Sequence, residues 1–349
     1  MSGNMMLTPE QRIGMTLGAI LKTAEVKEVL ATTGQMHDMD KNVGQVIKFR
    51  RFLPYGGAST NADTINRWVV DAAAHQIQEG VSPIPDKLDA VDYTVTMKYY
   101  GAVYYYTNFV QDMYEDDIPK YQKMQLGQRM GLVREKIREG ALRGCTNRYY
   151  AGGTSRATVD GKITMDALRS ITSQLKLNHA DFITSVVKAG PMFNTASVEP
   201  SFVVYVGPTG ENDVRNLPGF TKVVEYGGNT TPFHPLEIGA VDNFRFIVGP
   251  ELATIPNAGA AVGSTGLYST SGTYIDVVPF IIVGADAWGD VALKGMRAAK
   301  ITHLKPGQID KSDVLGLKGY CGAMFPSAMF VQNDGWMAIL EAGRTALNA

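Results

Sequence analysis

The sequence is poor in cysteine and in charge. Among 349 residues only Cys145 and Cys321 are cysteines, with no Cys-x-x-Cys spacing, so neither a disulfide framework nor a zinc site is indicated. Charged residues make up 19% of the chain, below the usual quarter, and 33 basic against 34 acidic residues leave a net charge of −1. This near-neutrality argues against a strong electrostatic grip on nucleic acid or an anionic membrane. The cysteine content is typical of a reducing cytosol.

Long hydrophobic runs are also missing. The longest uncharged stretch, residues 252–275, contains proline, four glycines and several serines and threonines, which would be costly in a bilayer. The N-terminus reads MSGNMMLTPEQR, without the basic region and apolar core of a secretory signal. The sequence therefore predicts a soluble cytoplasmic product with no membrane partner.

Motifs that mark common enzymes and cofactor sites are absent. There is no GxxxxGK[ST], GxGxxG, HExxH or GxSxG, and the five histidines are scattered. A calcium loop begins at Asp38, Asp40 and Asn42, but Val43 and Phe49 stand where such a loop needs Gly and Glu. We expect no cofactor, no metal and no catalytic residue. A catalytic triad leaves no trace in spacing, so a cytoplasmic two-domain enzyme stays an alternative.

Alternating patterns predict two strands of one long excursion. From Val43 to Leu53 apolar and basic residues alternate, and a second alternation runs from Val91 into the aromatic patch Tyr104–Tyr106. Between them, residues 65–72 have helical spacing, and prolines 83 and 85 mark a loop. The two strands are expected to form a long hairpin-like projection.

Helical spacing is strongest over residues 119–143, where apolar side chains recur every three or four positions. A helix of about 25 residues would be roughly 37 Å long, suited to act as a spine beneath a sheet. The acidic run Glu115–Asp117 precedes it, where carboxylates interact well with the helix dipole. Further helices are predicted from Thr8 towards Gly34 and over residues 165–175.

The second half of the chain predicts mixed α and β structure. Apolar strands are expected at residues 202–206 and 244–248, and residues 250–275 are expected to form a loop. Residues 323–331 and 336–341 flank Asn333-Asp334-Gly335, a pattern typical of a hairpin.

The candidate functional residues come from the tyrosines, which at 16 outnumber the 13 phenylalanines, and from the basic strand. Basic side chains at Lys48–Arg51 and the tyrosines near Tyr99–Tyr106 are compatible with nucleic-acid binding, but no RNA-binding motif accompanies them. Tyrosine is favoured where one end is buried and the other meets a polar partner. We predict that these residues contact other subunits; the candidates are Lys48, Arg50, Arg51, Glu79, Tyr99, Tyr104 and Tyr105.

Six segments carry a family resemblance. They are Lys41–Arg51, Glu79–Pro83, Tyr100–Gly101, Ala141–Asn147 with Tyr150–Gly153, Pro208 with Asp213–Arg215, and Glu237–Arg245. In this order they resemble the major capsid proteins of tailed bacteriophages, specifically the coat-protein family typified by N4-type podophages. The stretches near 65–76 and 250–275 depart from the family pattern.

The resemblance implies an α+β fold of the Hong Kong 97 capsid type. Its parts would be an N-terminal arm (1–42), an extended loop hairpin (43–110), a peripheral domain with the spine helix (111–165 and 300–349) and an axial domain (166–299). It implies hexamers and pentamers of one chain in an icosahedral head around double-stranded DNA, bound without sequence specificity. The implied location is the virion capsid, with assembly in the host cytoplasm.

The partners that the resemblance allows are portal, scaffolding and decoration proteins. A cellular nanocompartment shell of the same fold is a second alternative, beside the two-domain enzyme.

Overall fold

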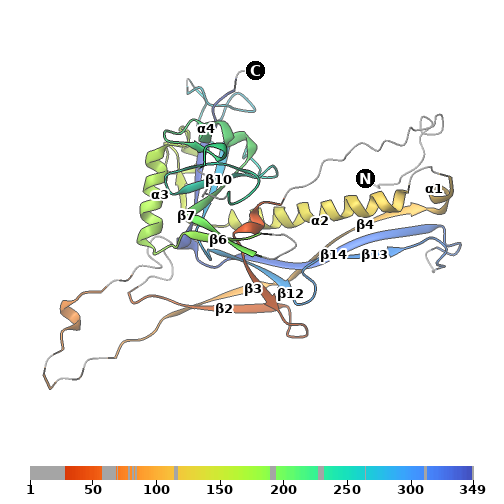
Figure 1. Ribbon diagram of the computed structural model, residues 1–349, viewed down its shortest axis with the longest axis horizontal. Coiled ribbons are helices and arrows are strands. Elements are labelled where there is room, and N and C mark those ends of the chain that lie inside the picture. Colours follow the sequence, from red (N-terminus) through yellow and green to blue (C-terminus); the bar gives the residue numbers. More distant parts are fainter. Residues whose placement is uncertain are drawn as a thin grey trace.

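The computed structural model describes residues 28–56, 68, 70–77, 79–80, 82, 85–113, 117–188, 194–226, 232–263, 265–309 and 313–347. The helix predicted from Thr8 lies almost entirely outside these residues, as does half of the helical spacing at 65–72. The described chain is elongated (Figure 1), with a compact α/β region, a long helix lying along a second sheet, and a projecting two-stranded ribbon.

The compact region is built on an eight-stranded sheet of the described residues. Its order is β5 (Arg148–Tyr150), β15 (Met337–Gly343), β11 (Val277–Val283), β7 (Asn194–Val206), β10 (Phe244–Val248), β9 (Glu237–Val241) and β8 (Thr221–Lys222), with β6 (Ile183–Lys188) also on β7. Every residue of β10, β11 and β15 is buried. Such continuous burial marks strands covered on both faces, which explains their unbroken apolar sequences.

Two helices accompany this sheet. The amphipathic helix α3 (Met165–Leu177) buries Leu168, Ile171 and Leu175 in the same core as β7 and β10, and α4 (Glu211–Arg215) adds Val214. Thr164 caps α3 by accepting the backbone N–H of Ala167. The predicted helix and the strands at 202–206 and 244–248 are confirmed.

The second sheet has five strands among the described residues. Its order is β1 (Gln35–Met39), β12 (Trp288–Leu293), β14 (Lys318–Val331) and β13 (Lys300–Leu304), with β4 (Lys98–Thr107) also paired to β14. A short helix α1 (Asn108–Met113) follows β4. The long helix α2 (Ile118–Leu142) then runs along one face of this sheet, as Figure 1 shows.

The predicted spine helix is confirmed within one residue at each end. Asp117 caps it by accepting the backbone N–H of Lys120 at 3.3 Å, and Pro119 sits in the first turn, where its missing N–H costs nothing. Leu126 and Met130 of α2 pack against Cys321 and Phe325 of β14. The periodic apolar stripe is therefore the side that meets the sheet.

The predicted excursion is the ribbon formed by β2 (Val46–Phe52) and β3 (Ala90–Thr96), which pair antiparallel with Arg50 opposite Asp92. β3 and β4 are separated by Met97, whose backbone N–H donates to the carbonyl of Gln45 at 2.9 Å. One nearly continuous segment therefore contributes β3 to the ribbon and β4 to the five-stranded sheet.

The predicted hairpin at residues 323–341 is wrong. β14 belongs to the five-stranded sheet and β15 to the eight-stranded sheet, so the two strands do not pair. The turn Asp334–Trp336 carries the chain from one sheet into the other. Two apolar runs around an Asp-Gly turn look the same in sequence whether they share a sheet or enter separate cores.

The expected domain boundaries do not follow the sheets everywhere. β5 and β15, from segments assigned to the peripheral domain, complete the eight-stranded sheet, whereas β12, from the axial segment, joins the five-stranded sheet. The described residues of the loop expected at 250–275 form no strand, only isolated bridges such as Ile255 to Val277.

Candidate subunit-contact surfaces

The exposed face of the ribbon carries two of the predicted contact residues, Lys48 and Arg50. Arg50 donates to Asp92 across the strand pair, from Nε to Oδ1 at 2.7 Å and from Nη2 to Oδ2 at 2.9 Å. This hydrogen bonding raises the pKa of Arg50 and lowers the pKa of Asp92. Both side chains are solvated, so the pair adds little to the stability of the chain. Its charges remain available at the surface.

Arg51 lies on the opposite face of the ribbon, because neighbouring residues of a strand point to opposite sides. Its guanidinium lies 5.7 Å from the Tyr93 ring centroid, and burial lowers its pKa. The basic run of the sequence is therefore divided between two surfaces: Lys48 and Arg50 face outward, while Arg51 packs within its own chain.

The base of the ribbon is fixed by aromatic packing. Phe49 stacks on Phe330 of β14 with ring centroids 4.7 Å apart, and the His37 ring lies 4.9 Å from Phe49. Ile47 and Val95 join the same cluster. Among the described residues, the ribbon is thus held to the five-stranded sheet at its base.

Beyond the ribbon strands, the chain continues into what we call the distal loop, residues 57–89. Its described part exposes large apolar side chains: Trp68 is 64%, Val70 57%, Ile77 73% and Leu88 72% exposed. Glu79, a predicted contact residue, is exposed here too. Exposed apolar side chains on one projection are typical of surfaces that contact another protein.

The predicted tyrosines, like the arginines, lie on opposite faces of their strand. Tyr99 and Tyr105 lie on the face of β4 away from α2, and Tyr99 is 62% exposed. Tyr104 lies on the face towards α2, in the cluster with Leu126, and Arg129 lies 5.9 Å from its ring centroid. Tyr104 is thus engaged within its own chain.

α2 covers one side of the five-stranded sheet, and the base of the ribbon packs on the other side at Ala328 and Phe330. Beside that contact, the part of this other side formed by β4, β13 and the first half of β14 is covered by none of the described residues, and we call it the open face. Strand pairing places on it, besides smaller side chains, Tyr99, Val103 and Tyr105 of β4, Lys318, Tyr320 and Met324 of β14, and Lys300 and Leu304 of β13. Val103 is 64%, Leu304 44% and Met324 41% exposed. A sheet normally buries its apolar side chains, whereas these are exposed among the described residues.

α2 has a second buried side that carries charged residues. The sequence patterns did not reveal it. Glu135 accepts the backbone N–H groups of Val29 and Leu30 at 2.9 and 3.0 Å. Arg138, only 3% exposed, donates to Glu28 at 2.6 Å and to Asp290 at 3.1 Å. These bonds fix the segment after residue 27 between α2 and β12. Charge periodicity alone looks like a solvated helix face, so no sequence signal distinguishes this one.

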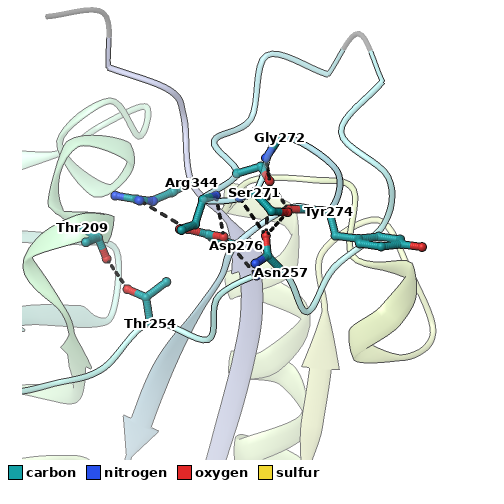
Figure 2. Close-up of polar contacts among 10 residues, drawn as sticks. Thr209, Thr254, Asn257, Ser271, Gly272, Tyr274, Asp276 and Arg344 are labelled. Carbon is teal, nitrogen blue, oxygen red and sulfur yellow. Dashed lines mark hydrogen bonds and ion pairs between the residues drawn. The ribbon is translucent and has the colours of Figure 1, made fainter.

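The loop at 250–275 is tied to the compact region by Asp276 (Figure 2). Its carboxylate accepts the backbone N–H of Asn257 at 3.0 Å, the Thr270 hydroxyl at 2.7 Å and Arg344 at 3.4 Å. Burial opposes ionisation of this carboxyl, but the hydrogen bonds from Thr270 and Asn257 outweigh it and lower its pKa. The Arg344 guanidinium also lies 3.7 Å from the Tyr268 ring centroid. The loop is thus held at several points despite having no regular strand.

The described residues contain no candidate metal site and no candidate membrane-spanning helix. No cluster of three or more His, Cys, Asp or Glu side chains there could hold a metal ion. Among the same residues, no helix combines the length and apolar character that crossing a membrane requires.

The arrangement of the two sheets, the long helix and the ribbon is a phage capsid fold. The capsid of Ralstonia phage GP4 matches with a TM-score of 0.66, covering 100% of both chains at 12% identity. The capsid of cyanophage Pam1 matches with a TM-score of 0.60, covering 99% of this chain and 100% of that one at 13% identity. The capsid of cyanophage P-SCSP1u gives 0.58 over 96% and 94%, at 12% identity.

A sequence relative agrees with the structural match. The major capsid protein of Pseudomonas phage KPP21 is 27% identical over an alignment of 211 residues, and the match covers 56% of this chain and 52% of the relative. The chain thus spans about half the length of the curated relative it matches. No family model matches the chain. The proteins named here are capsid proteins, not enzymes.

Proposed function

We propose that this chain is the major capsid protein of a phage, and that many copies assemble as hexamers and pentamers into an icosahedral head around double-stranded DNA. The observation that carries the proposal is the capsid fold, which extends over the whole chain and is accompanied by a capsid-protein relative. The virion capsid would be its final location and the host cytoplasm the place of assembly.

The surface of the chain supports this proposal. The distal loop and the open face leave apolar side chains in water, and a shell subunit covers such surfaces with its neighbours. A net charge of −1 lets many copies pack without strong mutual repulsion. A closed wall would retain DNA without a basic, sequence-reading surface.

We assign the fold to the Hong Kong 97 type, with the four parts expected from the sequence. The ribbon with the distal loop would be the extended loop, α2 the spine helix, and the eight-stranded sheet the centre of the axial domain. With this assignment β5 and β15 are better grouped with the axial domain, and β12 with the peripheral domain, because strands of one sheet share one core.

The seven candidate contact residues fall into two groups under this proposal. Lys48, Arg50, Glu79, Tyr99 and Tyr105 lie on outward surfaces and would meet other subunits. Arg51 and Tyr104 pack within their own chain, so we assign them a supporting role, holding the ribbon and β4 in place. Portal, scaffolding and decoration proteins would contact the finished shell.

The proposal is tested by expressing the full chain and following it by size-exclusion chromatography and electron microscopy. Closed megadalton shells are expected. A small, stable monomer that turns over a substrate would contradict the proposal and favour the two-domain enzyme. Shells isolated from their natural source with an enzyme inside, in place of DNA, would favour the nanocompartment.

A further inference from the structure

We infer that a groove beside the start of α2 binds phosphate groups. The groove lies between α2 and the edge strand β13, at the end of the long axis that also holds α1 (Figure 1). Its volume is about 510 Å³, a size usual for sites that bind small molecules. The side chains that line it include Tyr106, Asp117, Lys120, Lys123, His303 and Lys305.

Three lysines give the groove its charge. Lys120 and Lys123 come from the first turns of α2, and Lys305 directly follows β13. Among the described residues, no carboxylate forms an ion pair with any of these lysines. By contrast, the exposed Arg50 and Lys294 each have such a partner. The three ammonium groups are therefore available to a ligand.

A carboxylate, that of Asp117, also lines the groove. It accepts the backbone N–H of Lys120 at 3.3 Å and so caps α2. Three lysines against this one carboxylate leave two positive charges, and the 25-residue helix α2 adds the positive end of its dipole. This balance suits a phosphate group, which carries about one to two negative charges at neutral pH.

A hydrogen bond fixes the imidazole that lines the groove. Tyr106 is 2% exposed, and its hydroxyl group shares a hydrogen bond of 2.8 Å with Nε2 of His303. The two rings stack with their centroids 6.0 Å apart. Burial, together with the ammonium groups of Lys123 and Lys305, lowers the pKa of His303, and the carboxylate of Asp117 opposes this only in part. The imidazole therefore senses the lysine charges and whatever binds to them.

The residue types favour phosphate over a carboxylate. Arginine recognises carboxylates with a bidentate fork, and none of the described residues that line the groove is an arginine. Lysine offers a point charge with three rotatable donors, which suits phosphate oxygens. Free phosphate and the DNA backbone present this same group, and occupancy by the DNA backbone rests on the proposed function, under which the shell encloses DNA. Such a contact would hold phosphates without reading bases.

Titration of His303 in the full-length, unassembled chain tests the site. Nuclear magnetic resonance of histidine-labelled chain should show the pKa of His303 rising by about one unit when inorganic phosphate is added, because a bound anion offsets the lysine charges. His303→Gln assigns the signal. Lys123→Gln with Lys305→Gln should weaken phosphate binding by about tenfold or more. Lys300→Gln, on the opposite face of β13, is the matched control and should bind phosphate as wild type does.

A short DNA duplex separates the two sources of phosphate. The affinity of the unassembled chain for a fluorescent duplex is measured at several salt concentrations. In Lys123→Gln with Lys305→Gln, the slope of log affinity against log salt should become shallower by about two, since each lost phosphate contact removes about one released counterion. An unchanged slope, with inorganic phosphate still bound at the groove, would assign the site to free phosphate and not to the DNA backbone.

The outcomes separate the site from the proposed function. A folded wild-type chain that binds phosphate but never forms shells would contradict the capsid proposal and leave the site standing. The site alone is overturned if the chain forms normal shells but phosphate leaves the His303 signal unmoved, or if the double lysine variant binds phosphate as tightly as wild type.

Discussion

The two sheets of this chain differ in how complete they are. The eight-stranded sheet has three strands buried along their whole length and a large core with α3. The five-stranded sheet is covered by α2 on one side, and among the described residues the other side is covered only in part, by the base of the ribbon. The first region folds on its own contacts, whereas under the proposed function other copies would complete the second.

This difference also separates stability from assembly. Substitutions in the eight-stranded core should unfold the chain and lose assembly as a consequence. Substitutions on the open face or the ribbon should leave the fold intact and change assembly alone. The comparison is useful because the two effects are measured by different experiments.

The largest expected effect comes from the core. Phe280→Ala removes a side chain that is 1% exposed in β11 and should lower the free energy of unfolding by about 3–5 kcal/mol. Val103→Ala on the open face should change it by less than about 0.5 kcal/mol and still reduce shell yield. Denaturant unfolding of the unassembled chain measures the first quantity, and electron microscopy the second. Equal loss of stability in both variants would remove the distinction between the regions.

An intermediate effect is expected at the 250–275 loop as the pH falls. The pKa of Asp276 is lowered in the folded chain, so its ionised form stabilises the fold above the ordinary value of 3.8, and this stability is lost as the pH drops through the folded pKa. Asp276→Asn should therefore be less stable than wild type at neutral pH, by about 2 kcal/mol. The gap should narrow below pH 3.8.

Unfolding curves of wild type and Asp276→Asn at several pH values measure this gap. Asp242→Asn, at an exposed carboxylate that faces the exposed Arg169, serves as the control and should follow wild type throughout. A gap that is constant with pH would show that the charge of Asp276 does not hold the loop.

Local patterns in the sequence were sufficient to predict individual helices and strands but not to assign the strands to sheets. The ribbon strands and α2 were predicted because their periods of two and 3.6 follow from burial of one face. The pairing of β14 and β15 was mispredicted because an apolar run does not record which sheet receives it.

The candidate site shows the same limit. The residues Lys48–Arg51 and the tyrosines were identified as contact candidates from composition, yet their division between outward and inward faces depends on strand register. The buried charges of α2, Glu135 and Arg138, depend on a segment more than 100 positions away. Such distant partners leave no periodic signal in a single sequence.

The smallest effect on folding is expected at the exposed ion pair of the ribbon. Arg50→Glu places a carboxylate opposite Asp92, but both positions are solvated, so the melting temperature of the unassembled chain should be unchanged. Assembly should slow, because an outward cation has become an anion on a face proposed to meet a neighbour. Arg50→Glu with Asp92→Arg restores the cross-strand pair but not the original order of charges. If the double variant assembles at the wild-type rate, Arg50 acts only by pairing within its own ribbon; if it stays slow, Arg50 itself meets the neighbouring subunit.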